Sequence, residues 1–135
     1  MLSPKRTKFQ KYQKNVTWKT KQNNQKLSFG KYGIKSSSCW RLPARTIEAV
    51  RRVITRKLKR HGKVWICIFP DIPVTKKPAE VRMGKGKGSL HFWVANIMKG
   101  QILFEIDGVA EQQAFEAFRL VREKLPFSIQ FIKYD

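Results

Sequence analysis

The first clear helix, which decides the fold, lies in residues 43–62, Pro43-Ala-Arg-Thr-Ile-Glu-Ala-Val-Arg-Arg-Val-Ile-Thr-Arg-Lys-Leu-Lys-Arg-His-Gly62. Pro43 suits the first helical turn because its missing N–H would have no partner there, and Gly62 is the residue type expected just after a helix. Between them, apolar residues recur at steps of three and four, which predicts a single apolar stripe packed on a sheet. The stripe consists of Ile47, Val50, Val53, Ile54 and Leu58.

The other faces of this predicted helix are strongly cationic. A helix that faces only water usually alternates Glu with Lys four residues apart. Here Glu48 is the only acidic residue between Ala44 and Gly62. We therefore expect the helix to turn a cationic face outward, away from the sheet. That face carries Arg45, Arg51, Arg52, Arg56, Lys57, Lys59 and Arg60.

Four further segments have the alternating or β-branched pattern of strands. Residues 27–38 predict a strand with a kink or bulge at Gly30 or Gly33, and residues 63–69 predict a buried strand. Three prolines then predict an irregular connection as far as residue 80. Residues 90–97 and 101–106 predict two strands paired with each other across the turn at 98–100.

A second helix is predicted from Glu111 to Leu125, because Ala114, Phe118, Val121 and Leu125 fall on one face and Pro126 follows. A last strand is predicted over residues 127–134. The resulting fold class is α+β: a mixed, mostly antiparallel sheet with two helices on one face. An extended basic segment, residues 1–26, precedes this single domain, residues 27–135, and a loop at 76–88 protrudes from it.

Positive charge is concentrated in the first two thirds of the chain. Of 135 residues, 29 are Lys or Arg and 9 are Asp or Glu, a formal net charge of +20. Residues 1–40 carry ten basic and no acidic side chains. Residues 1–88 carry 24 basic and 3 acidic ones, whereas residues 89–135 carry 5 and 6. Such an excess repels itself in a compact state unless a polyanion neutralises it, which points to nucleic acid.

The basic segment 1–26 is rich in Lys, Gln, Asn and Thr and has too few apolar residues to fold alone. Its aromatic residues, Phe9, Tyr12 and Trp18, are spaced among lysines. In RNA-binding segments such aromatic side chains stack on bases. We expect the segment to become ordered on RNA; the alternative is a flexible tail that only aids solubility.

Residues 81–88 read Val-Arg-Met-Gly-Lys-Gly-Lys-Gly, a glycine-rich stretch with three cations. A nucleotide-binding interpretation fails, because phosphate-binding loops need GxxxxGK[ST] before a helix and the dinucleotide motif needs its third glycine one position later. The favoured interpretation is a thin loop that carries charge into a space lined by phosphates. A mobile surface loop is the alternative.

Other classes of site find no support in the sequence. Cys39 and Cys67 form no CxxC pair, and neither histidine, His61 or His91, lies near them, so we expect no metal site and no cofactor. Cys67 is expected in the core, and Cys39 could face either way. No catalytic constellation is present, so we expect no enzyme. No apolar run reaches the length of about 18 residues that spans a membrane, and we expect no export signal.

Taken together, these segments resemble the bacterial and organellar form of universal large-subunit ribosomal protein sixteen. The resemblance covers nearly the whole chain, and its most specific part is 82–88. The matching runs are Met1–Phe9, Ala44–Ala49, Arg51–Arg52, Gly62–Ile66, Phe69–Asp71, Lys77–Pro78, Val81–Gly88, Phe92–Ala95 and Phe104–Val109.

The resemblance implies a hammerhead-like α+β domain that binds large-subunit rRNA, helps to shape the tRNA sites near the peptidyl-transferase centre, and contacts neighbouring ribosomal proteins. It also implies that the loop reaches toward the acceptor end of tRNA in the peptidyl site, and that Arg82 is a position hydroxylated in bacteria. The loop residues are Arg82, Met83, Gly84, Lys85, Gly86, Lys87 and Gly88. The expected rRNA-binding residues are Lys5, Arg6, Lys8, Lys11, Arg45, Arg51, Arg52, Arg56, Lys59 and Arg60.

The chain departs from this family in two places. Residues 10–26 replace an arm usually rich in Arg and Gly, and Pro43 replaces the usual Ser/Thr helix cap. The start of the chain and its Lys/Asn/Ile content are similar to plastid-encoded members, so we expect the plastid stroma, with a mitochondrion or bacterial cytoplasm as alternatives. A monomer is expected. The rival functions are a free RNA chaperone or general nucleic-acid-binding protein, and a phosphate-processing enzyme built on the glycine loop.

Overall fold

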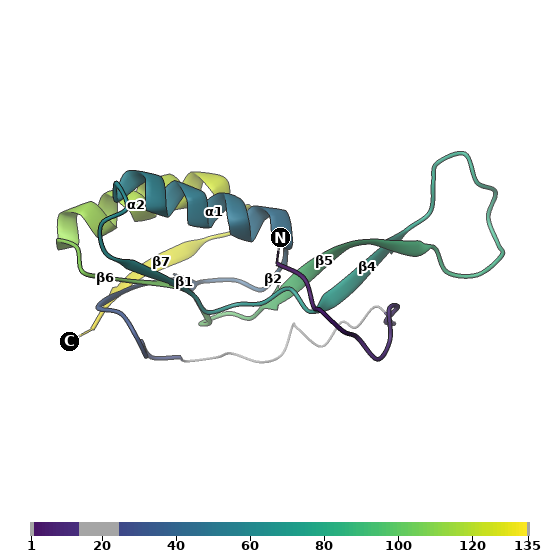
Figure 1. Cartoon of the computed structure of the whole chain (residues 1–135), viewed down its shortest axis with the longest axis horizontal. Coiled ribbons are helices and arrows are strands. Elements are labelled where there is room, and N and C mark those ends of the chain that lie inside the picture. Colours follow the sequence, from purple (N-terminus) through teal and green to yellow (C-terminus); the bar gives the residue numbers. More distant parts are fainter. Residues whose placement is uncertain (1, 14–24, 135) are drawn as a thin grey trace.

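Two helices lie side by side over one face of an antiparallel sheet (Figure 1). The computed structural model describes residues 2–13 and 25–134. The helices are α1 (Ala44–Lys57) and α2 (Glu111–Lys124). The sheet beneath them has four strands in the order β3 (Lys63–Ile66), β6 (Ile102–Asp107), β1 (Tyr32–Ser36) and β7 (Ile129–Lys133), each antiparallel to its neighbour. The predicted α+β class with two helices is thus confirmed.

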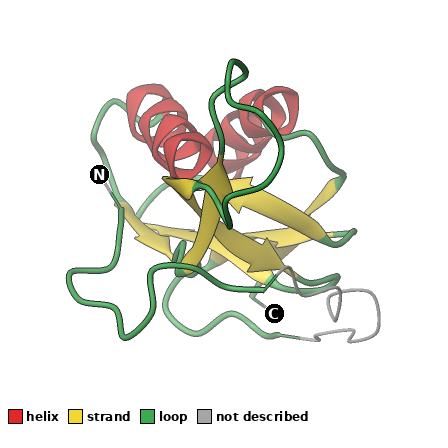
Figure 2. Ribbon diagram, turned by 90° about the vertical axis from the view of Figure 1, so that its right-hand side faces the viewer, coloured by secondary structure: helices red, strands yellow, loops and turns green. Residues whose placement is uncertain are grey.

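A second antiparallel sheet forms an arm that leaves the domain at one end (Figure 1). Its order is β2 (Trp40–Pro43), β5 (Ser89–Ile97) and β4 (Ile72–Lys76). The loop between β4 and β5 protrudes from the far end of the arm. Figure 2 looks at the molecule from this end and shows both helices on the same side of the strands.

The core lies between the helices and the sheets, and both predicted helix stripes face it. Ile47, Val50 and Ile54 are fully buried, and Leu58 is nearly so. In α2, Ala114, Phe118, Val121 and Leu125 are buried as well. Helical periodicity therefore identified the packed face of each helix correctly. Fully burying one such side chain contributes roughly 1.5–3 kcal/mol.

The predicted pairing of strands 90–97 and 101–106 is wrong. These segments are β5 and β6, and they belong to different sheets. Between them Gly100 adopts a φ of +84°, and its N–H donates to the carbonyl oxygen of Ser36 at 2.8 Å. The turn thereby fastens the chain to the end of β1 instead of folding it back on β5. Apolar alternation identifies a strand but not its partner.

β4 was not predicted, because Pro70, Pro73 and Pro78 appeared to exclude regular structure there. β4 pairs only with β5, and Pro73 lies within it opposite Trp93. Proline cannot donate to a ladder, but an edge strand has one side that needs no donor. An edge position therefore explains how a strand accommodates this proline.

Several predicted boundaries are corrected. Strand 63–69 shortens to β3 (Lys63–Ile66), which is half-buried, and strand 127–134 shortens to β7 (Ile129–Lys133). Pro43 is not in the first helical turn but caps α1 from the end of β2, with a φ of −65°. Gly62 does not follow the helix directly, since α1 ends at Lys57. A Cβ on Gly62 would lie 2.4 Å from the carbonyl oxygen of Asp107, so glycine is needed for the entry to β3.

The predicted strand 27–38 is also too long, because residues 27–31 lie outside β1. The irregularity in its pairing falls between Ile34 and Lys35, not at either glycine. Both glycines permit close approach instead. A Cβ on Gly30 would meet the carbonyl oxygen of Ile106 at 2.7 Å, and one on Gly33 would meet the Leu27 side chain at 2.3 Å. Residues 27–30 therefore pack directly on the sheet.

A buried carboxylate holds this segment in place. Glu105 of β6 is 2% exposed, and its side chain accepts hydrogen bonds from the backbone N–H groups of Ser28 (3.2 Å), Phe29 (2.7 Å) and Gly30 (2.8 Å). The Cys67 thiol donates to it at 3.6 Å. Cys67 was expected in the core, but it is half-buried beside Glu105. Three N–H groups without strand partners are thus satisfied by one side chain.

Candidate nucleic-acid interface

The outer face of α1 presents the expected row of cations. Because the apolar stripe faces the sheet, the side chains between its members face solvent. Arg51 alone among the expected residues is half-buried. The exposed cations from this helix and the turn after it are Arg45, Arg52, Arg56, Lys57, Lys59 and Arg60.

The one acid of α1 organises two of these arginines. Glu48 lies 2.6 Å from Arg51 Nη2 and 3.1 Å from Arg52 Nε. The hydrogen bond from Arg51 is the main cause that lowers the pKa of Glu48 to about 2; partial burial opposes it, and Arg52 adds to it. Arg51 makes two hydrogen bonds to Glu48, whereas Arg52 makes one and keeps 70% of its side chain exposed. Arg52 is therefore better placed than Arg51 to bind a phosphate.

Arg45 lies where the helix meets the arm. Its guanidinium carbon is 5.8 Å from the centre of the Phe92 ring on β5, within the range of a cation–π contact. The contact holds the Arg45 side chain between the first turn of α1 and the arm.

The loop between β4 and β5 projects into solvent. Residues 78–87 are exposed, and Met83 is 98% exposed. Gly84, Lys85 and Gly86 have φ values of +99°, +57° and +81°, so two of three successive left-handed positions have no Cβ to strain them. A Cβ at either glycine would have no neighbour within 4 Å. At the base, a Cβ on Gly88 would lie 2.6 Å from the carbonyl oxygen of Lys76, so the loop closes tightly.

The loop geometry also bears on the nucleotide-binding alternative. β5 begins at Ser89, directly after the last glycine, so the loop leads into a strand. A phosphate-binding loop instead precedes a helix, whose N-terminal N–H groups bind the anion. The structure thus lacks the helix that this alternative requires at this position.

The described part of the N-terminal segment meets the loop at Lys87. Lys11 Nζ donates to the carbonyl oxygen of Lys87 at 3.2 Å, and Lys87 Nζ donates to that of Tyr12. Lys5, Arg6 and Lys8 are exposed on the same segment. Residue Trp18 lies outside the described residues. The structure thus brings together two cationic segments 76 positions apart, a contact that no local signal in the sequence indicates.

Lys77 was not among the predicted site residues; its Nζ donates to the carbonyl oxygen of Gly84 across the loop. Its position at the base of a glycine-rich loop was the one feature of the sequence that could have indicated it.

The cations of α2 differ from those of α1. Arg119, Arg122 and Lys124 alternate with Glu116 and Glu123, as on a face directed at water.

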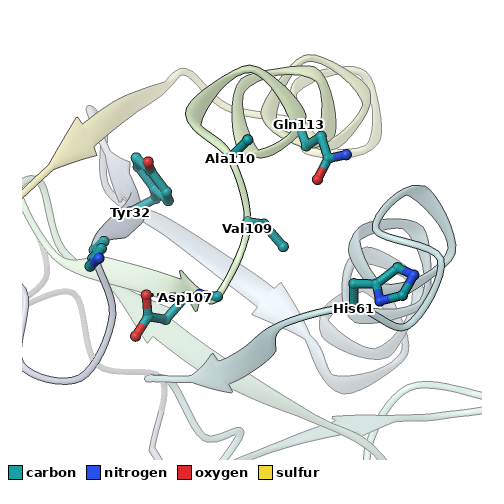
Figure 3. A pocket seen from close by; sticks show the side chains of 8 residues that line it. Tyr32, His61, Asp107, Val109, Ala110 and Gln113 are labelled. Atoms are coloured by element: carbon teal, nitrogen blue, oxygen red, sulfur yellow. Dashed lines mark hydrogen bonds between the residues drawn. The ribbon is translucent and has the colours of Figure 1, made fainter.

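A surface hollow of about 520 Å³ next to α2 has both a histidine, His61, and an aspartate, Asp107, in its lining (Figure 3). In it, the His61 ring and the Asp107 carboxylate point away from each other. Asp107 accepts a hydrogen bond from the N–H of Gly108 at 2.8 Å. This hollow therefore holds no paired acid and base.

Within residues 2–13 and 25–134, no three His, Cys, Asp or Glu side chains are grouped so as to hold a metal ion. No helix of the described chain has the length and apolar character needed to cross a membrane.

A helix with one cationic face, together with a thin cationic loop on an arm, defines a class of polyanion-binding protein suited to nucleic-acid phosphates. The chain belongs to the family described as Ribosomal protein L16p/L10e, whose model matches residues 4–132. It is 55% identical, over 100% of both chains, to "Large ribosomal subunit protein uL16m" of Prototheca wickerhamii. It is 54% identical to "Large ribosomal subunit protein uL16" of Dichelobacter nodosus (strain VCS1703A), over 97% of this chain and 96% of that protein. Membership of this family confirms the resemblance inferred from the sequence. Because it is a family of ribosomal proteins, it also confirms the expectation that the chain is not an enzyme.

Proposed function

We propose that this protein is a structural component of the large ribosomal subunit and binds its rRNA through the outer face of α1 and the basic N-terminal segment. The observation that carries the proposal is the contrast between the two helices. α1 presents cations with a single acid, whereas α2 alternates both signs. If both helices simply faced water, both would be expected to alternate acidic and basic side chains. The full-length similarity to large-subunit proteins supports the same function.

In this proposal, charge supplies affinity and the shape of the RNA supplies specificity. The side chains that bind phosphate are the rRNA-binding residues predicted from the sequence. Arg51 contributes least, because its guanidinium is already hydrogen-bonded to Glu48. Adjacent ribosomal proteins are the other partners. The predicted RNA binding of the segment also covers residues 14–24, which lie outside the described residues.

The salt dependence of rRNA binding tests this function. We expect log K to fall by roughly 0.7–0.9 for each tenfold rise in salt and for each phosphate neutralised, which gives a steep slope for this many cations. The measurement is filter binding of the whole chain to deproteinised large-subunit rRNA between 50 and 200 mM salt, the range over which such losses are large. A shallow slope would contradict a charge-driven interface.

Sedimentation separates a ribosomal component from a free RNA chaperone. A component held at a fixed site should remain with large subunits through a salt wash that removes loosely bound proteins. A chaperone without a fixed site should be recovered in the supernatant, and that result would favour the alternative.

We further propose that the loop, Arg82–Gly88, acts next to tRNA. Its exposure, thin glycine backbone and three cations suit a space lined by phosphates. We expect Lys85→Ala combined with Lys87→Ala to leave incorporation into subunits intact while tRNA binding or peptide transfer is impaired. Peptide-transfer rates of purified subunits measure the effect, with Lys99→Ala, an exposed lysine of the 98–100 turn, as the control. An unchanged rate of peptide transfer in the double variant would contradict the proposal that the loop acts next to tRNA.

Three compartments are consistent with a ribosomal protein of this sequence. The Lys/Asn/Ile content favours the plastid stroma, while the similarity to a uL16m protein of Prototheca wickerhamii favours a mitochondrion and that to a Dichelobacter nodosus protein a bacterial cytoplasm. Fractionation of the source cells, with immunodetection in the ribosomes of each compartment, distinguishes them.

A further inference from the structure

An exposed aromatic pair lies beside the four-stranded sheet, away from α1 and from the loop. The rings of Phe29 and Trp65 are stacked, with centroids 6.1 Å apart and planes inclined by 19°. Phe29 is 66% exposed, and Trp65 on β3 is half-buried beneath it. One face of the Phe29 ring thus contacts Trp65, and much of the remaining ring surface faces solvent.

The chain holds Phe29 in this position firmly. Its N–H donates to Glu105 at 2.7 Å, and the N–H groups of its neighbours Ser28 and Gly30 bind the same buried carboxylate. The missing Cβ of Gly30 allows the backbone to lie against Ile106. Ordering a residue costs conformational entropy, and an exposed ring recovers little of it by burial. A ring held outward in this way is suited to contact with a partner.

Two exposed lysines, Lys31 and Lys63, lie near the pair in the chain or on its strand. Lys63 lies two residues before Trp65 on β3, so its side chain leaves the same face of the sheet. Lys31 lies two residues after Phe29, and both lysines are exposed, whereas Lys26 lies against β7 at the other edge of the sheet. Asp107, the register partner of Lys63, accepts from the N–H of Gly108 and keeps its negative charge, so it offsets part of the charge of Lys63. A flat apolar surface with ammonium groups around it matches a nucleotide, whose base stacks while its phosphate pairs with lysine.

We infer that Phe29 and Trp65 form a stacking platform for one unpaired base of the large-subunit rRNA. The base lies on the free face of Phe29 and extends the stack by one member, and Lys31 and Lys63 neutralise the adjoining phosphates. This inference rests on the proposed rRNA binding and adds a second contact surface, on a different part of the domain from the outer face of α1.

The test compares Phe29→Leu with Phe29→Tyr in the whole chain, bound to deproteinised large-subunit rRNA. Leucine keeps the apolar bulk but removes the ring, whereas tyrosine keeps the ring. We expect Phe29→Leu to weaken binding by roughly 5- to 100-fold, the range that one base stacked on an aromatic side chain contributes. Phe29→Tyr should bind within about twofold of the unsubstituted chain, since the stack is retained.

The salt slope distinguishes this contact from charge. Because Phe29→Leu removes no phosphate ligand, its slope should equal that of the unsubstituted chain while its affinity is lower at every salt concentration. Thermal unfolding by circular dichroism checks that the variants are folded. Equal binding by Phe29→Leu would overturn the platform, and so would equal losses in the leucine and tyrosine variants. Failure of the unsubstituted chain to bind rRNA would instead overturn the proposed function.

Discussion

The Glu105→Gln variant is expected to unfold with a free energy about 2–4 kcal/mol lower than that of the unsubstituted chain, because hydrogen bonds to a buried charge are each worth about 1.5–3 kcal/mol. Both oxygens of the Glu105 carboxylate accept N–H groups from residues 28–30. Glutamine would replace one oxygen by an NH2 group that faces N–H donors. With its oxygen at the Oε2 position, glutamine still accepts from Phe29 and Gly30, but its NH2 group faces the N–H of Ser28 and the Cys67 thiol, and the charge that strengthens these hydrogen bonds is lost.

Urea unfolding at neutral pH measures this effect. The matched control is Glu116→Gln on α2, because Glu116 is paired with Lys57 at 2.7 Å but 44% of its side chain is exposed. Exposed ion pairs contribute about 0–1 kcal/mol, so the control should unfold almost like the unsubstituted chain. Similar losses in the two variants would contradict a special role for the buried carboxylate.

The same residue determines an acid-sensitive part of the stability. Burial acts to raise the pKa of Glu105, but the hydrogen bonds from Gly30, Phe29 and Ser28 outweigh it and lower the pKa below its ordinary value of 4.5. Its contribution is therefore fully present above that value and is lost as the pH falls through the lower value of the folded protein. The difference between the unsubstituted chain and Glu105→Gln should shrink accordingly in acid. Cys67 remains a thiol at neutral pH, because burial and the adjacent Glu105 raise its pKa to about 12.

The Arg52→Ala, Arg56→Ala double variant should bind large-subunit rRNA roughly 25- to 60-fold less tightly near 0.1 M salt, because two phosphate contacts each contribute about 0.7–0.9 log units there. The slope of log K against log salt should become shallower by about 1.4–1.8 for the same reason. Both arginines are exposed on the outer face of α1, and alanine preserves the helix. Glu48 keeps Arg51 as its partner at 2.6 Å.

The control for this variant is Arg119→Ala combined with Arg122→Ala on α2, which removes the same charge from a face of mixed sign. Both changes lower the net charge by two, so a general attraction between protein and RNA would weaken binding equally. A fixed interface on α1 predicts a loss confined to the first variant. Equal losses would mean that only the total charge matters.

Local patterns in the sequence predicted the parts of the structure that depend on neighbouring residues. The stripe from Ile47 to Leu58 and that from Ala114 to Leu125 identified both helices, because residues three and four apart share a face. The exposed cations of α1 followed from the same periodicity. The glycines of 84–88 indicated a thin loop, as the structure has it.

Contacts between distant segments could not be predicted in this way. The partner of β5 depends on the turn at Gly100, where a hydrogen bond to Ser36 redirects the chain. The contact of Lys11 with Lys87 and the binding of residues 28–30 to Glu105 join segments more than seventy positions apart. From the sequence alone, Glu105, which lies between Phe104 and Ile106, would be predicted to point to solvent. Its burial becomes apparent only when the segment that covers it is placed in space.

β5 runs from the loop, past a register shift in its pairing with β4 between Val74 and Thr75, into the core, where Ala95 and Ile97 are buried. The arm is thus a cantilever: its nine residues rise about 3.3 Å each, so its free end lies some 30 Å from its fixed end. A tilt of about 5° at the root would move the free end by about 2.5 Å, nearly the rise of one residue. In the proposed complex, the orientation of α1 on the rRNA would therefore determine the position of Lys85 and Lys87.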